Sequence, residues 1–228
     1  MLAVAVPVAM GGFFVLLGQT FDYPDVMDLP AGEVLTRLGE AGDEVTASWL
    51  GATISAVLFL ALVVCFDRVV RDEGGDGGRV AALNLVTVFG VLATLFMLLD
   101  LGQWVWLNPH LGRRYVDPAT DPAIRASLEV TWDAFHRYVG VGVGIYAATF
   151  FNALWAMGVG MLLLGAQRVV LAWLAIASGV LFLASIAPGV GFDGYAFLNS
   201  VGFALWALWL VLLGWVLVRG GTIARPAG

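Results

Sequence analysis

The sequence contains no lysine, so all 11 of its basic residues are arginine. Mechanisms that require a lysine amine are therefore excluded: a retinal Schiff base, a pyridoxal-phosphate anchor and a P-loop. The single cysteine, Cys65, cannot supply a disulfide framework, a cysteine-rich zinc site or a cysteine-ligated iron–sulfur cluster within one chain. Two histidines remain, and because His110 falls in a predicted loop, a haem held between two spans by His110 and His136 is not indicated. The sequence predicts no cofactor and no metal site.

Charge is also scarce, because only 12% of the 228 residues are charged, against about 25% in an ordinary soluble domain. The net charge of −6 disfavours a nucleic-acid partner, whose phosphates require clustered basic residues. Apolar residues make up 61% of the chain, and the mean hydropathy is +0.91. The composition therefore indicates an integral protein of the cell membrane, with membrane lipid as its main surroundings.

Long apolar segments define the architecture. A hydrocarbon core about 30 Å thick requires roughly 20 apolar residues in a helix. Six segments of the chain meet this length, at about residues 2–18, 49–66, 80–104, 139–164, 169–187 and 196–218. They lack the polar alternation of barrel strands, and helices satisfy every backbone polar group internally. The sequence predicts an all-α, polytopic membrane helical bundle with six transmembrane helices, formed by residues 1–228 as one integral membrane domain.

Two connections are too long to be simple turns. In the first, residues 19–48, the apolar spacing of Val34, Leu35 and Leu38 predicts a short amphipathic helix on the outer surface. The alternative is a solvated connector. In the second, residues 108–128, Asp121 is placed to cap a helix that begins at Pro122.

An even number of spans puts both termini on one side, and arginine content favours the cytoplasmic side. Six arginines lie on the side of the termini and four or five on the other, so the margin is narrow. Indole rings prefer the headgroup region. We therefore expect one membrane interface at Trp49, Trp104, Trp106 and Trp132, and the other at Trp173 and Trp215.

Asp100 is the strongest single candidate for a functional residue, since a charge inside a span costs about 2.5–3.5 kcal/mol on insertion scales. Gln103 follows three residues later, on the same helical face. One interpretation is a carboxylate that binds a proton or contacts a cation in an internal cavity. The alternative is an ion pair with Arg113, Arg114 or Arg137 at the outer rim.

A second candidate cluster comprises Asp133, His136 and Arg137, which share one side of a helix at positions i, i+3 and i+4. A carboxylate beside an imidazole raises its basicity, so Asp133 and His136 suit a proton relay or a metal ligand. The alternative is an Asp133–Arg137 surface pair beside an interfacial histidine that binds nothing.

The fourth span is rich in residues that suit helix contacts. Asn152 is a further candidate for the ligand or proton pathway, although asparagines in spans usually hydrogen-bond between helices. Gly140, Gly144 and Gly158 give this span a small-residue surface for close helix packing. That surface leaves open an internal contact, a homo-oligomer interface or a companion membrane subunit.

Several segments resemble a known family. They are residues 29–35 (LPAGEVL), residues 56–62 (AVLFLAL) before a basic loop, and, near the end, residues 173–175 (WLA), 178–181 (SGVL) and 201–209 (VGFALWALW) before Leu213-Gly214 and Arg219. In their order along nearly the whole chain, these segments are similar to domain of unknown function family 4386, small prokaryotic six-helix membrane proteins. The resemblance implies a fold and a location, and it carries no activity.

Recognisable catalytic motifs are missing: the chain has no Gly-x-Ser-x-Gly, no His-Glu-x-x-His and no serine–histidine–acid arrangement. The sequence therefore favours a non-enzymatic protein that binds or moves a small apolar or weakly polar ligand through the bundle. One alternative is a membrane-embedded enzyme or redox subunit with a site at the outer mouth. Another is a structural partner subunit of a membrane complex. No catalytic residue is assigned.

Overall fold

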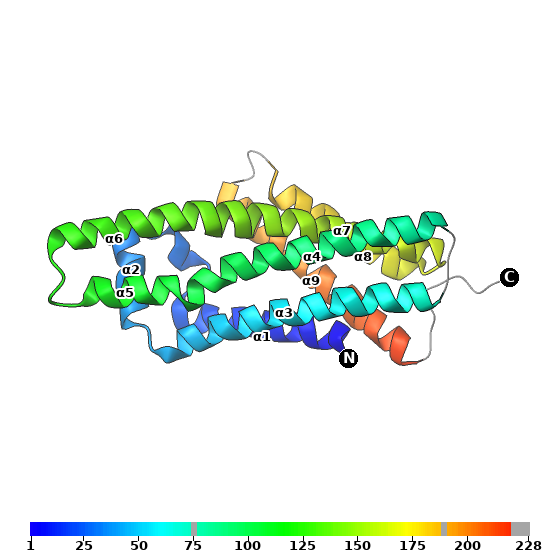
Figure 1. Ribbon diagram of the computed structural model, residues 1–228, viewed down its shortest axis with the longest axis horizontal. Coiled ribbons are helices and arrows are strands. Elements are labelled where there is room, and N and C mark those ends of the chain that lie inside the picture. The colour runs from blue at the N-terminus through cyan, green and yellow to red at the C-terminus, as the bar shows by residue number, and fades with distance from the viewer. Residues whose placement is uncertain (74–76, 188–190, 220–228) are drawn as a thin grey trace. The chain divides into compact units, whose positions relative to one another are not determined.

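The computed structural model describes residues 1–73, 77–187 and 191–219, and within them all regular structure is helical (Figure 1). The all-α fold predicted from the sequence is confirmed. The α-helices are α1 (Leu2–Phe21), α2 (Ala31–Glu40), α3 (Asp43–Asp72), α4 (Gly77–Val105), α5 (Leu107–Val116), α6 (Pro122–Phe135), α7 (Thr149–Gly165), α8 (Val169–Ser185) and α9 (Gly191–Val218). A 3-10 helix, η1 (Asp25–Asp28), and a π-helix, η2 (His136–Ala148), complete the described elements.

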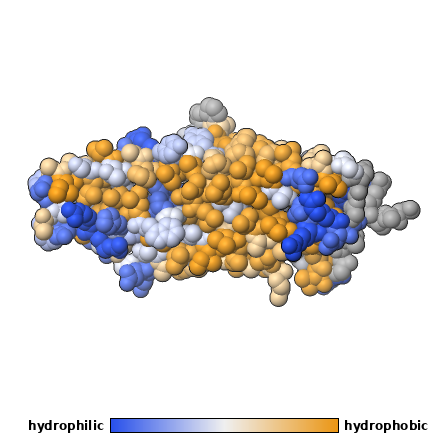
Figure 2. Space-filling view, in the orientation of Figure 1, coloured by the Kyte–Doolittle hydropathy of each residue, from blue (hydrophilic) through white to orange (hydrophobic). Residues whose placement is uncertain are grey.

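Five helical segments are long and apolar enough to cross a membrane: Leu2–Phe21, Asp43–Asp72, Gly77–Val116, Pro122–Gly165 and Gly194–Val218. The remaining predicted span corresponds to α8, which has 17 residues and is about 25 Å long. That length is at the lower limit for crossing the hydrocarbon core. Along α4 the surface side chains are mainly apolar, whereas hydrophilic ones gather over α5 and near the end of α3 (Figure 2).

The second long connection differs from the prediction, because most of it is helical. After a one-residue break at Trp106, α5 continues over residues that were expected to form a loop. Pro109 is its third residue, and proline is tolerated in the first turn of a helix, where its missing N–H has no partner to lose. The other expectation for this connection is confirmed: the Asp121 side chain accepts a hydrogen bond from the backbone N–H of Ile124 and caps α6.

The chain divides into two compact units, which we describe separately. Unit 1 comprises Met1–Val8, Val57–Leu95 and Tyr146–Gly228, and unit 2 comprises Ala9–Ala56 and Phe96–Ile145. The boundary falls within α1, α3, α4 and η2, so each of these helices contributes residues to both units. That the chain forms one integral membrane domain stays a prediction.

In unit 1, α8 packs against both α7 and α9 through glycines. A Cβ on Gly160 would meet the backbone oxygen of Ala172 at 2.9 Å, and one on Gly179 would meet that of Ala153 at 2.8 Å. The start of α1 contacts the end of α9, where a Cβ on Gly214 would lie 3.2 Å from Ala3.

In unit 2, α2 packs against α5 and α6, and its apolar residues Val34, Leu35 and Leu38 are buried there. The expected amphipathic helix is therefore confirmed, but its apolar face covers other helices of the chain. The backbones of α2 and α5 touch where Gly39 meets Gly112. Close approach of this kind requires residues without a side chain.

The tryptophans expected at the membrane interfaces fall into a buried and an exposed group. Trp49, Trp104 and Trp132 are at most 4% exposed, and Trp49 stacks on Trp104 with ring centroids 4.6 Å apart. Trp106, Trp173 and Trp215 are more than half exposed, as residues at a membrane interface would be. Composition alone cannot distinguish these two groups, because an indole ring serves a packed core as well as an interface.

We predict that Gly112→Ala destabilises the protein by about 1–3 kcal/mol, the usual cost of overpacking. The new Cβ would lie 2.7 Å from the backbone nitrogen of Gly39, which cannot rotate away. Gly12→Ala is the matched control, because Gly12 is also helical and a Cβ there meets nothing within 4 Å. Thermal unfolding in detergent should show a lower midpoint for Gly112→Ala only, and equal midpoints would contradict the α2–α5 contact.

Candidate functional site

Asp100 and Gln103 form the centre of a polar cluster in unit 2. Both lie near the end of α4, and the Gln103 Nε2 atom donates a hydrogen bond to Asp100 Oδ1 at 2.9 Å. The spacing of three residues predicted that they share a helical face, and this is confirmed. Gln103 is only 7% exposed, whereas Asp100 is half-buried. The amide therefore holds the carboxyl group in a fixed orientation.

Two glycines of η2 bring its backbone against this pair. A Cβ on Gly144 would collide with the Asp100 carboxyl group, and a Cβ on Gly140 would lie 3.4 Å from Gln103 Nε2. The predicted close packing at Gly140 and Gly144 is therefore an internal contact with α4. Side chains at these two positions would separate η2 from the polar groups of α4.

The π-helical form of η2 was not predicted. Its sequence, HRYVGVGVGIYAA, has glycines at Gly140, Gly142 and Gly144. Glycine is a weak α-helix former, and alternate glycines leave few side-chain contacts between turns to favour α-helical winding. Such i→i+5 segments are rare and often occur at functional sites.

His136 begins η2 and lies on the other side of Gly140. Its Nδ1 atom would be 3.1 Å from a Cβ on Gly140, so His136 and Gln103 approach the same point. The imidazole stacks on Trp132, with ring centroids 4.8 Å apart and planes 8° from parallel. Trp132 is a member of the site that sequence reasoning missed. Its position four residues before His136 on a predicted helix was the available signal.

Two buried polar atoms of this cluster have no hydrogen-bond partner among the described residues: Gln103 Oε1 and His136 Nδ1. Buried polar atoms are usually paired, because an unmade hydrogen bond costs about 1–3 kcal/mol. Gln103 Nε2 and His136 Nδ1 both lie near the Cβ position of Gly140, and the Asp100 carboxyl group lies at that of Gly144. We define Asp100, Gln103, His136, Gly140 and Gly144 as the Gly140 cluster.

The other two candidates of the second cluster pair with each other instead. Arg137 Nε donates to both carboxylate oxygens of Asp133, at 2.9 and 3.0 Å. The pair is exposed, with 75% of the Arg137 side chain accessible. A proton relay would need a hydrogen bond between Asp133 and His136. His136 instead stacks on Trp132. This arrangement matches the second interpretation of the cluster, a surface ion pair between Asp133 and Arg137 beside the histidine.

Within the described residues, the hydrogen-bond partner of Asp100 is Gln103, and no arginine lies within ion-pair distance of it. The alternative of a rim ion pair with Arg113, Arg114 or Arg137 is therefore wrong. The Asp100 carboxyl group meets an amide and the backbone of a glycine.

The remaining predicted residues lie in unit 1. Asn152 has a buried Oδ1 without a hydrogen-bond partner among the described side chains, and a Cβ on Gly158 would meet Val86 of α4. Gly158 thus serves helix packing, as predicted. Neither residue belongs to the Gly140 cluster.

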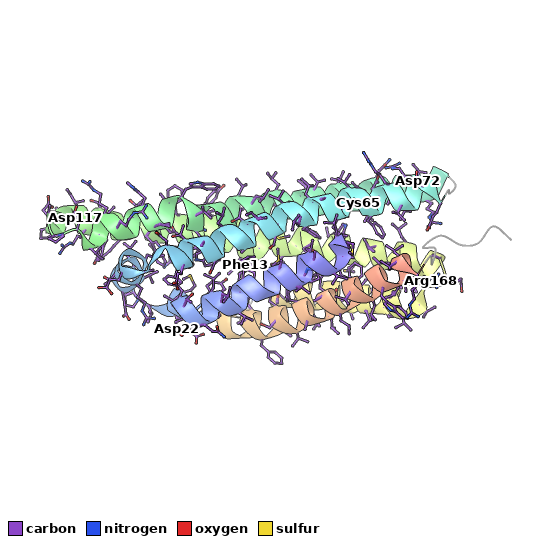
Figure 3. The ribbon with its side chains drawn as sticks, turned by 90° about the horizontal axis from the view of Figure 1, so that it is seen from below. Phe13, Asp22, Cys65, Asp72, Asp117 and Arg168 are labelled. Carbon is purple, nitrogen blue, oxygen red and sulfur yellow. The ribbon has the colours of Figure 1, made fainter. Side chains whose placement is uncertain are left out.

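Unit 1 holds a second polar network that sequence reasoning did not assemble. Asp67 accepts hydrogen bonds from Arg71 and Thr87, and Arg71 also donates to Asn84. The network ties α3 to α4 near Asp72, which Figure 3 labels at the end of α3. Each of these four side chains has a partner within the network.

His110 is exposed on α5, whereas His136 is half-buried against Trp132. Among the residues that the structure describes, no group of three or more His, Cys, Asp or Glu side chains is placed to hold a metal ion.

No protein-family model, curated protein or solved structure matches the chain.

We predict that Gly144→Ala lowers the unfolding midpoint, because the added Cβ would meet the Asp100 carboxyl group. Asp100→Ala in the same chain should recover part of the loss, since it removes the carboxyl atoms from the contact. Gly142→Ala, two residues away, is the control, because its Cβ would meet only its own helix, at 3.6 Å. Thermal unfolding of the wild type, Gly144→Ala, Asp100→Ala and the double variant forms a double-mutant cycle, and strictly additive effects would contradict the Gly144–Asp100 contact.

Proposed function

We propose that this protein is an integral membrane protein that binds, or moves through its helical bundle, a small apolar or weakly polar ligand at the Gly140 cluster. The observation that supports the proposal is that Gln103 and His136, whose side chains both lie against Gly140, each carry a buried atom without a hydrogen-bond partner among the described residues, Oε1 and Nδ1. A ligand that hydrogen-bonds to both would remove the cost of leaving them unpaired.

The proposal includes the location and the topology. Five helices long and apolar enough to span a membrane support a membrane protein, and with α8 as the sixth span both termini lie on one side. The narrow arginine bias places that side in the cytoplasm. Membership of domain of unknown function family 4386 is part of the same proposal and rests on the sequence segments alone.

The glycine contacts favour a ligand site over docking of a second chain. Gly140 and Gly144 are covered by α4, Gly158 by Val86, and Gly160 by α8. A homo-oligomer or a companion subunit would therefore have to use another surface. An enzyme or redox subunit has less support, because the Asp133–His136 relay on which it depended is replaced by the Asp133–Arg137 pair.

The test is to measure which small molecules stay bound to the purified protein, by extraction and mass spectrometry. We expect His136→Ala and Gln103→Ala each to reduce the retained ligand about tenfold or more, the equivalent of a lost buried hydrogen bond. Both variants should still be expressed and monodisperse.

His110→Ala is the matched control, because this histidine is exposed on α5 and lies outside the cluster. It should retain the wild-type amount of ligand. Loss of ligand from all three variants would indicate general destabilisation, and unchanged retention in His136→Ala and Gln103→Ala would remove the Gly140 cluster from the proposed function.

A further inference from the structure

The chemistry of the unpaired atoms in the Gly140 cluster narrows the class of ligand. Because Gln103 Nε2 donates to Asp100, the remaining amide atom of Gln103, Oε1, can only accept a hydrogen bond. His136 Nδ1 is also an acceptor in the tautomer that carries its proton on Nε2. The carboxylate oxygens of Asp100 are acceptors as well. Gln103 Nε2 keeps one further N–H, so the cluster offers three acceptor groups against one remaining donor and is short of hydrogen-bond donors.

The charge of the cluster favours a cationic ligand. Asp100 lies in a predicted span, and among the described residues no arginine is within ion-pair distance of it. The nearest arginine in sequence to His136 is Arg137, and its guanidinium group is held by Asp133 and is exposed. A carboxylate without a cation in a membrane bundle is costly, and a cationic partner relieves the cost.

The aromatic neighbour suits a small organic cation rather than a metal ion. Trp132 is buried and stacked on the imidazole, so the cluster is bounded by flat rings on the His136 side. The imidazole covers the indole face toward His136, so Trp132 contributes an apolar wall that suits the carbon part of an organic cation. The indole N–H of Trp132 also lacks an acceptor, but the same holds for Trp49, Trp155, Trp206 and Trp209, so it is not specific to this site.

Resting on the proposed function, we propose that the ligand is a small protonated primary or secondary amine. A primary ammonium has three N–H groups, which donate to the Asp100 carboxylate, to Gln103 Oε1 and to His136 Nδ1, and a secondary ammonium donates to two of these acceptors. The three side chains lie along Gly140 and Gly144. A metal cation would be a poorer match, because the cluster supplies one carboxylate, one amide oxygen and one imidazole nitrogen, whereas hard cations prefer six or more oxygens.

The experiment measures the thermal unfolding midpoint of the full chain in detergent against the concentration of methylammonium chloride. Sodium chloride keeps the ionic strength constant. Tetramethylammonium chloride is the comparison cation without an N–H donor, and methanol is the neutral donor of similar size. We expect a saturable rise of the midpoint with methylammonium, and no saturable rise with tetramethylammonium or methanol.

Asp100→Asn should weaken methylammonium binding at least tenfold, because it removes the charge and keeps the shape. Asp117→Asn is the matched control, since Asp117 lies in the turn between α5 and α6 (Figure 3) and the same net charge is lost there. It should bind methylammonium as the wild type does. If Asp100→Asn does not fold, Gln103→Met provides the same test with an uncharged change.

The outcomes separate this inference from the proposed function. Equal binding of tetramethylammonium, or unchanged methylammonium binding in Asp100→Asn, would overturn the amine and leave the ligand site standing. If the purified protein retains a neutral molecule that depends on His136 and Gln103 and methylammonium does not bind, the inferred ligand class is likewise wrong. If nothing is retained and no probe binds, both proposals fail.

Discussion

The structure depends on one constraint: polar groups inside a lipid bilayer must find their hydrogen-bond partners within the protein. Helices meet this requirement for the backbone, and the buried hydroxyl groups of Thr53, Ser55 and Thr94 meet it by donating to a backbone oxygen one turn earlier. Amide and imidazole groups have more than one hydrogen-bonding atom, and one helix turn satisfies only part of them, as Asp100 does for Gln103 Nε2. The remaining atoms need partners from another part of the fold or from a ligand.

Glycine determines which groups can meet across helices. At Gly39 and Gly112 the missing side chains allow two backbones to touch, which fixes α2 against α5. At Gly32 the gap is filled by Tyr115 and Glu129, whose side chains hydrogen-bond to each other at 2.5 Å. At Gly140 the same kind of gap faces Gln103 and His136, which do not pair. All three contacts depend on a glycine, and they differ in whether the neighbouring polar atoms have hydrogen-bond partners.

Span length and hydropathy predicted the fold well, because a bilayer imposes both on the sequence directly. Helix α5 was missed because Pro109 and its polar neighbours look like a loop when tertiary packing against α2 is unknown. In the site, the three-residue spacing predicted the Asp100–Gln103 pair, since it depends only on local helix geometry. The approach of Gly140 and Gly144 to that pair depends on how η2 packs against α4, and no local pattern contains that information.

Comparison of the two polar clusters argues that the Gly140 cluster is completed from outside the chain. In the network of Asp67, Arg71, Asn84 and Thr87, a cation, a carboxylate, an amide and a hydroxyl group satisfy one another. The Gly140 cluster contains a carboxylate, an amide and an imidazole, and among the described residues it has no arginine within ion-pair distance and two open acceptors. Replacing Gln103 and His136 by apolar residues of similar size would avoid the cost of these open groups. The ligand proposed above, which donates hydrogen bonds and carries positive charge, would account for them.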